Sequence, residues 1–188
     1  MNSGNLFSEE QVEIVDEDTY DLFRYMYQVP QWQECKDSIP SKMNFDLLGS
    51  VDLKKGCFVG QELTARTQYT GVVRKRPFLV FAHSEKQVPQ LKDPKTRANV
   101  GLKYLNPTFN VPLAGRTAKD SSGRDALKVI GSRYNYCLAL FEYMDANEHT
   151  FKGEEGIYYT VLDPEYLGPE LATYKSELAE RLAKQAQF

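Results

Sequence analysis

The chain has few of the residues that build metal sites or disulfide frameworks. Its 188 residues include only three cysteines and two histidines. The cysteines, Cys35, Cys57 and Cys137, lie far apart and form no CxxC pair, so a zinc site within the chain is not expected. An odd and sparse set of cysteines also favours a reducing compartment over a secreted disulfide framework.

The chain also lacks long hydrophobic runs and a positive net charge. No apolar segment approaches the roughly 20 residues that a membrane-spanning helix needs, so we expect a soluble protein without membrane insertion. The net charge of -3 and the pI of about 5.5 give no overall attraction for nucleic acid. Residues 1–10 match neither a secretory signal nor a mitochondrial presequence. The protein therefore acts in the cytosol, or this chain is a piece of a longer protein.

The composition, with 41% hydrophobic and 12% aromatic residues, is that of a folded protein with one good core. An acidic run over residues 8–18 is expected to be a solvated connection or the first turn of a helix. The spacing over residues 19–28 predicts a short amphipathic helix that Pro30 ends. Its apolar face is expected to hold Leu22, Phe23, Met26 and Tyr27. Residues 30–55 show little periodicity and are predicted to be an ordered irregular connection.

The second part of the chain has the pattern of an antiparallel β structure. Runs rich in β-branched and aromatic residues, separated by turn signals, occur at residues 78–81, 129–130, 136–141 and 157–162. Their spacing predicts a small barrel of about five or six strands. Residues 165–187 are predicted to form a closing amphipathic helix. Its stripe consists of Leu167, Leu171, Tyr174, Leu178 and Leu182, and packs against the core or against a partner.

Cys57 is the candidate reactive residue. It lies between Gly56 and Gly60, and glycine allows a tight turn or a close approach to a ligand. The following residues, from Gln61 on, have good helix propensity, so the thiol is expected just before a helix N-terminus, which favours thiolate. Cys35 and Cys137 are expected to be inert buried residues.

Four cations, Arg66, Arg74, Lys75 and Arg76, follow Cys57 within a short stretch. Two interpretations remain open for them. They bind an anionic partner such as polyglutamate, phosphate or an acidic protein face, or they are solvated charges that protect a strand edge from aggregation.

The segment 55–62, with the sequence KGCFVGQE, continues as LTART and then GVVRKR at residues 71–76. This long motif closely resembles the signature of the YgfZ-type family of iron-sulfur cluster assembly factors, relatives of the glycine-cleavage T-protein aminomethyltransferase. The longer form looks most like the mitochondrial member that acts with A-type scaffold proteins in making [4Fe-4S] clusters. The resemblance covers about residues 20–168.

The resemblance implies an α+β fold with two parts. Residues 1–70 would be an incomplete N-terminal region of a T-protein-like folate-binding fold, ending in the cysteine motif, and residues 71–188 a β-barrel domain with a terminal helix. It implies that Cys57 is the thiol needed for activity and a ligand of a transient cluster shared with a partner. The residues that would line a tetrahydrofolate-sized cavity are Lys55, Gln61, Glu62 and Arg66.

The resemblance further implies a mitochondrial matrix protein whose partners are A-type scaffold proteins. Two other interpretations stay open: a folate-dependent one-carbon transferase like the T-protein, or an inactive fragment of either protein. A non-enzymatic assembly factor is favoured because a proton-transfer carboxylate and much of the folate wall would belong to an N-terminal half that this chain lacks.

Overall fold

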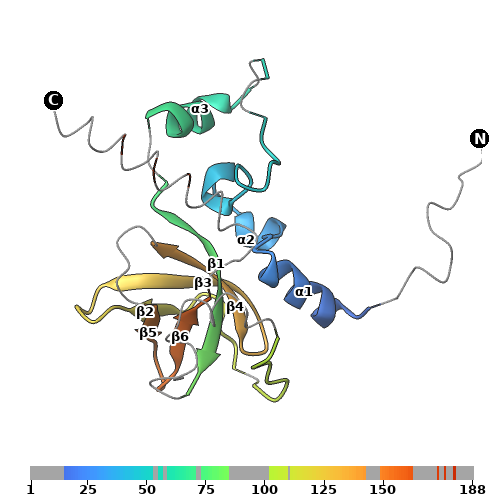
Figure 1. Ribbon diagram of the computed structural model, residues 1–188, viewed down its shortest axis with the longest axis vertical. Helices are drawn as coiled ribbons and strands as arrows, with labels where there is room; N and C mark the ends of the chain where they lie inside the picture. The colour runs from blue at the N-terminus through green and yellow to red at the C-terminus, as the bar shows by residue number, and fades with distance from the viewer. Residues whose placement is uncertain are drawn as a thin grey trace, which may run out of the picture.

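The computed structural model describes residues 15–52, 55–56, 59–70, 73–84, 102–109, 111–142 and 149–162, together with Thr173, Ser176 and Glu180. Within these residues the chain forms an antiparallel β-barrel, with short helices gathered beside and above it in the view of Figure 1. This arrangement confirms the predicted α+β class with a barrel.

The barrel is closed and has six strands in the order β1-β4-β3-β2-β5-β6 among the described residues. The prediction of about five or six strands is therefore confirmed. The strands are β1 (Lys75–His83), β2 (Thr117–Lys119), β3 (Asp125–Arg133), β4 (Tyr136–Glu142), β5 (Thr150–Lys152) and β6 (Tyr158–Val161). Pairing of β1 with both β4 and β6 closes the ring, so no open edge remains between these strands.

Strand β1 is buried on both faces from Arg76 onward. Phe78, Val80 and Ala82 point into the barrel and join its apolar core. Leu79 and Phe81 point outward into a second apolar cluster, which includes Leu22 and Tyr25 of the first helix. A strand covered on both sides needs a continuous apolar run, which explains why residues 78–81 show no alternation.

Helix α1 (Glu17–Met26) covers this outer face of the barrel. Asp16 is its N-cap and accepts a hydrogen bond from the Thr19 backbone N–H at 2.7 Å, so the described end of the acidic run serves as the helix start. The predicted face is wrong in part, because Phe23 and Tyr27 are exposed. Polar residues took their place on the buried side, where they form ion pairs with the barrel and with α2.

The predicted irregular connection contains two short helical elements, α2 (Trp32–Cys35) and the 3-10 turn η2 (Pro40–Met43). Each has four residues, too few to show a helical period in the sequence. A third helix, α3 (Gln61–Thr70), follows the cysteine motif and contacts η2. Figure 1 shows α3 at the end of the molecule opposite the barrel.

The predicted closing helix lies mostly outside the described residues. Thr173, Ser176 and Glu180 are described, and all three are helical and exposed. The apolar stripe of that helix stays a prediction. No helix in the described part of the chain is long and apolar enough to cross a membrane.

Candidate functional site

The structure describes four of the five candidate site residues. Lys55 is exposed next to Gly56, and Gln61, Glu62 and Arg66 all belong to α3. Cys57 lies outside the described residues. The helix predicted to begin at Gln61 is confirmed, so the motif leads directly into a helix N-terminus.

Gly60 sets the conformation of the chain at the start of α3. Its φ is +83°, in the region that L side chains rarely adopt. A Cβ built on Gly60 would meet no atom of the described residues within 4 Å. The glycine is therefore needed here for its backbone conformation.

The start of α3 carries polar and apolar side chains that face solvent. Glu62 and Arg66 are exposed and lie four residues apart, on one face of the helix. Two large apolar side chains are also exposed, Val59 fully and Leu63 by 57%. This mixture of charge and exposed hydrophobic surface at the start of the motif helix suits contact with another protein.

Arg76 of β1 binds the segment around η2, which precedes the cysteine motif in the chain. Its guanidinium makes two parallel bonds of 2.8 Å to the Asp46 carboxylate and donates at 2.7 Å to the Ser41 carbonyl oxygen. Asn44, in the left-handed region at φ +63°, donates from Nδ2 to the Pro77 carbonyl oxygen at 2.9 Å. Strand β1 and the η2 segment are thus joined by both charged and neutral hydrogen bonds.

Neither interpretation of the cationic stretch is right for Arg76. Arg74 and Lys75 are exposed, but Arg76 is completely buried. It is neither a solvated edge charge nor a group available to an external anion, because Asp46 already holds it in a bidentate pair.

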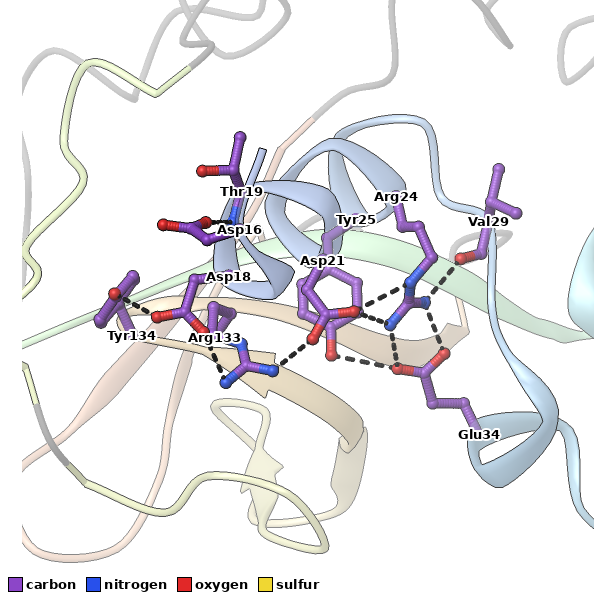
Figure 2. Close-up of polar contacts among 10 residues, drawn as sticks. All are labelled: Asp16, Asp18, Thr19, Asp21, Arg24, Tyr25, Val29, Glu34, Arg133 and Tyr134. Atoms are coloured by element: carbon purple, nitrogen blue, oxygen red, sulfur yellow. Dashed lines mark hydrogen bonds and ion pairs between the residues drawn. The ribbon is translucent and has the colours of Figure 1, made fainter. Parts of the chain in front are cut away.

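A second set of ion pairs attaches α1 and α2 to the barrel, as Figure 2 shows. Arg24 bonds both Asp21 at 2.6 Å and Glu34 at 2.9 Å. Arg133, at the end of β3, pairs with Asp18 at 2.9 Å and with Asp21. The two arginines therefore share Asp21, and the network links three elements.

Tyr25 completes this network and donates its hydroxyl to Glu34 Oε1 at 3.0 Å. Burial and the adjacent Glu34 carboxylate raise the pKa of Tyr25 well above its usual value. Burial alone would raise the pKa of Asp21, but hydrogen bonds from Arg133 and Arg24 outweigh it, so the pKa of Asp21 is lowered. Tyr25 therefore stays a donor and Asp21 a carboxylate at neutral pH.

Sequence reasoning did not identify either network. The spacing of Asp21 and Arg24 allows a pair within one helix, and this signal was available. Glu34 pairs with Arg24 across a break between two helices, and the pairs of Arg76 with Asp46 and of Arg133 with Asp21 join distant parts of the chain. No local pattern indicates such pairs.

The two described cysteines are poor nucleophiles. Cys137 is completely buried in β4, and this burial raises the pKa of its thiol strongly. Cys35 is half-buried at the end of α2, where burial and then Glu34 raise the pKa of its thiol. The expectation of a buried core thiol is confirmed for Cys137, whereas Cys35 is not fully buried.

We expect Cys57 to react faster with iodoacetamide than Cys35 or Cys137, because thiolate is the reactive form and both of the other thiols have raised pKa values. Alkylation of the native protein between pH 6 and 9 (roughly the range in which thiols titrate), followed by peptide mapping, measures the three rates. Equal or slower labelling of Cys57 would contradict this expectation.

The described residues hold no group of three or more His, Cys, Asp or Glu side chains that could bind a metal ion. A single thiolate also supplies only one of the roughly four cysteine ligands that a [4Fe-4S] centre takes. A cluster at Cys57 would therefore need ligands besides this thiolate.

Several known proteins that carry the same functional name are similar to this chain. The chain is 34% identical over 150 residues to the mitochondrial iron-sulfur cluster assembly factor IBA57 homolog of Coccidioides immitis, covering 74% of this chain and 34% of that protein. The corresponding protein of Phaeosphaeria nodorum is 32% identical over 148 residues, covering 77% and 36%. That of Dictyostelium discoideum is 39% identical over 113 residues, covering 57% and 26%.

No protein-family model matches the chain. The chain spans about a third of the length of the curated relatives it matches. All three relatives carry the same functional name, and the family indicated by the motif is thereby confirmed. The chain belongs to the IBA57-type family of iron-sulfur cluster assembly factors.

Proposed function

We propose that this chain acts in the assembly of [4Fe-4S] clusters of mitochondrial proteins. The observation that carries the proposal is the similarity over about three quarters of the chain to proteins named as mitochondrial iron-sulfur cluster assembly factors. The mitochondrial matrix is the proposed location, since the relatives are named as mitochondrial and the family resemblance implies the matrix.

In this proposal Cys57 binds iron of a cluster that is the cargo and not a resident cofactor. Its thiolate replaces a donor ligand on a cluster iron, so that an Fe–S bond to Cys57 forms as the bond to the donor breaks. A ligand of the recipient later replaces Cys57 in the same way, without a net change in oxidation state. Lys55 and the N-terminal end of α3 favour the thiolate electrostatically. Gln61, Glu62 and Arg66 shape the surface on which the cargo or its carrier docks.

The remaining cluster ligands come from a partner, which we propose to be an A-type scaffold protein. Support comes from the single thiolate of the motif and from the exposed Val59 and Leu63 beside it. Protein interfaces bury apolar side chains at their centre and leave charged residues at the rim. Glu62 and Arg66 are placed to form such a rim.

The family resemblance adds a further proposal: the fold is T-protein-like and binds a reduced folate as well as the cluster. Lys55, Glu62 and Arg66 are exposed, whereas ligand pockets bury most of a small molecule. We therefore expect this chain alone to bind tetrahydrofolate weakly or not at all in titration calorimetry. One-to-one binding with a Kd of about 1 μM (roughly −8 kcal/mol) or tighter would contradict that expectation.

The proposal is tested in cells that carry codon changes at the gene's own locus, so that the natural protein is used whatever its length. The activity of [4Fe-4S] enzymes such as aconitase, compared with that of cluster-independent matrix enzymes, reports the proposed function. Replacing Cys57 should lower the activity of the [4Fe-4S] enzymes and leave that of the cluster-independent enzymes unchanged. An equal loss of the two activities would count against a role in cluster assembly.

A further inference from the structure

Arg76 occupies an unusual place for a charged residue. It lies two residues before Phe78, in the register of β1 that points into the barrel, and it is completely buried. Removing a guanidinium from water is costly unless its hydrogen bonds are replaced. Here Asp46 and the Ser41 carbonyl oxygen accept hydrogen bonds from the two terminal nitrogens of the guanidinium.

The partners of Arg76 belong to a segment that covers one end of the barrel. Ser41 lies in η2 and Asp46 follows it, and the next residues, Leu47 and Leu48, pack against the apolar core inside the barrel. We call residues 41–48 the end cap. Arg76, at the start of β1, attaches this end cap to the barrel through an ion pair. Asn44 attaches it a second time through a neutral hydrogen bond to the Pro77 carbonyl oxygen.

The end cap also supports the motif helix. Turn η2 contacts β1 on one side and α3 on the other. Helix α3 ends at Thr70, five residues before β1 begins at Lys75, so the chain keeps the C-terminal end of α3 close to the strand that carries Arg76. The position of α3 is therefore limited in two ways, by this short connection and by its contact with η2.

We propose that the Arg76–Asp46 pair is a positioning device for the cysteine motif: by holding the end cap on the barrel it fixes the orientation of α3 and of the residues presented at its start. The role of this orientation in recognising a partner rests on the proposed function. The pair itself touches neither cargo nor partner, because the side chain of Arg76 is completely buried and that of Asp46 is only 12% exposed.

The experiment compares two conservative variants, Arg76→Lys and Asp46→Asn, with the matched control Arg133→Lys. Arg133 also holds a helix on the barrel through ion pairs, but it acts on α1 and not on the end cap. Lysine at position 76 keeps the positive charge but cannot make the two parallel hydrogen bonds to a carboxylate that arginine makes. Asp46→Asn keeps the shape and removes the charge, and Arg76→Lys keeps the test valid if the Asp46→Asn variant fails to fold.

Native-state amide hydrogen exchange, measured well below the melting temperature, is the first readout. We expect exchange in α3 to become at least about tenfold faster in the Arg76 variant while the barrel strands are unaffected, because local opening is separate from global unfolding. The control should leave α3 unchanged. Exchange in α3 that is unchanged, or accelerated only together with the barrel, would overturn the proposal.

The second readout is [4Fe-4S] enzyme activity in cells carrying Arg76→Lys at the gene's own locus. We expect a partial loss, with the protein present at its normal level. Faster exchange in α3 with full activity would overturn the functional part of the inference. Failure of the proposed function is a different result, since it would be shown by full activity with the Cys57 variant, which leaves the Arg76–Asp46 pair intact.

Discussion

Replacing Gly131 with alanine is expected to lower the free energy of unfolding by about 3 kcal/mol or more. A Cβ at this position in β3 would lie 2.6 Å from the Tyr25 hydroxyl oxygen and closer still to Glu34 Oε1. Glu34 is the shared acceptor of Arg24 and Tyr25. The new methyl group would therefore displace the carboxylate that holds α1 and α2 together on the barrel.

The size of this effect follows from the burial of the network. Arg24 and Glu34 have side chains only 7% exposed, and separating one partner of a buried pair leaves a charge without compensation. For a chain of this length, the expected loss corresponds to a fall in melting temperature of about 6–12 °C. Thermal unfolding followed by circular dichroism measures it.

Gly56→Ala is the matched control for Gly131→Ala. A Cβ at Gly56 would meet no atom within 4 Å in the described part of the chain, and the φ of Gly56 is not in the left-handed region. We expect this control to change the melting temperature by only a degree or two, as surface substitutions usually do. A Gly131 variant as stable as the Gly56 variant would show that the contact between β3 and Glu34 does not stabilise the fold.

The sequence predicted the barrel better than the parts attached to it. The runs at residues 78–81, 136–141 and 157–162 lie in or overlap β1, β4 and β6 and show their β-type composition, whereas the run at residues 129–130 marks only the middle of β3. Strands β2 and β5 have three residues each, too few for a pattern to be recognised. Their place in the ring is set by pairing with distant strands, which local composition does not reveal.

The errors over α1 and β1 have one physical cause. Amphipathicity assigns apolar residues to the buried side, yet Asp21 and Arg24 are buried while Phe23 is exposed. Arg76 is likewise buried within a stretch that has the pattern of a surface. In each case ion pairs offset the cost of burial. The pair of Asp21 with Arg24 is local, but the pairs of Arg133 with Asp21 and of Arg76 with Asp46 cannot be found from the neighbouring sequence.

The candidate site was predictable where its properties are local. The turn before α3 and the start of the helix follow from Gly60 and the helix propensity of the next residues, and both agree with the structure. The attachment of the site to the barrel through Asp46 is not local. The roles of Lys55, Cys57, Gln61, Glu62 and Arg66 remain proposals.

Substitution of Cys57 by serine is expected to have the largest effect on function. Serine keeps the size of the side chain but is a far poorer ligand for cluster iron than a thiolate. Stability should change little, because the substitution is nearly isosteric and the neighbouring described positions, Gly56 and Val59, are exposed. In cells we expect the activity of [4Fe-4S] enzymes to fall to the level of a gene deletion.

Two controls separate the chemistry of the thiol from the architecture of the turn. Cys35→Ser removes a half-buried thiol with a raised pKa and should retain activity. Gly60→Val places a β-branched residue at φ +83°, which costs of the order of 1–3 kcal/mol, and should reduce both melting temperature and activity. Only the Cys57 variant is expected to lose activity while keeping its stability.

The central claim, that this family member acts in cluster assembly through Cys57, is tested most directly by aconitase activity in cells carrying Cys57→Ser at the gene's own locus. The result we predict is loss of aconitase activity, with normal levels of the variant protein and normal activity of a cluster-independent matrix enzyme. Full aconitase activity in these cells would contradict the account and remove the thiol from the mechanism.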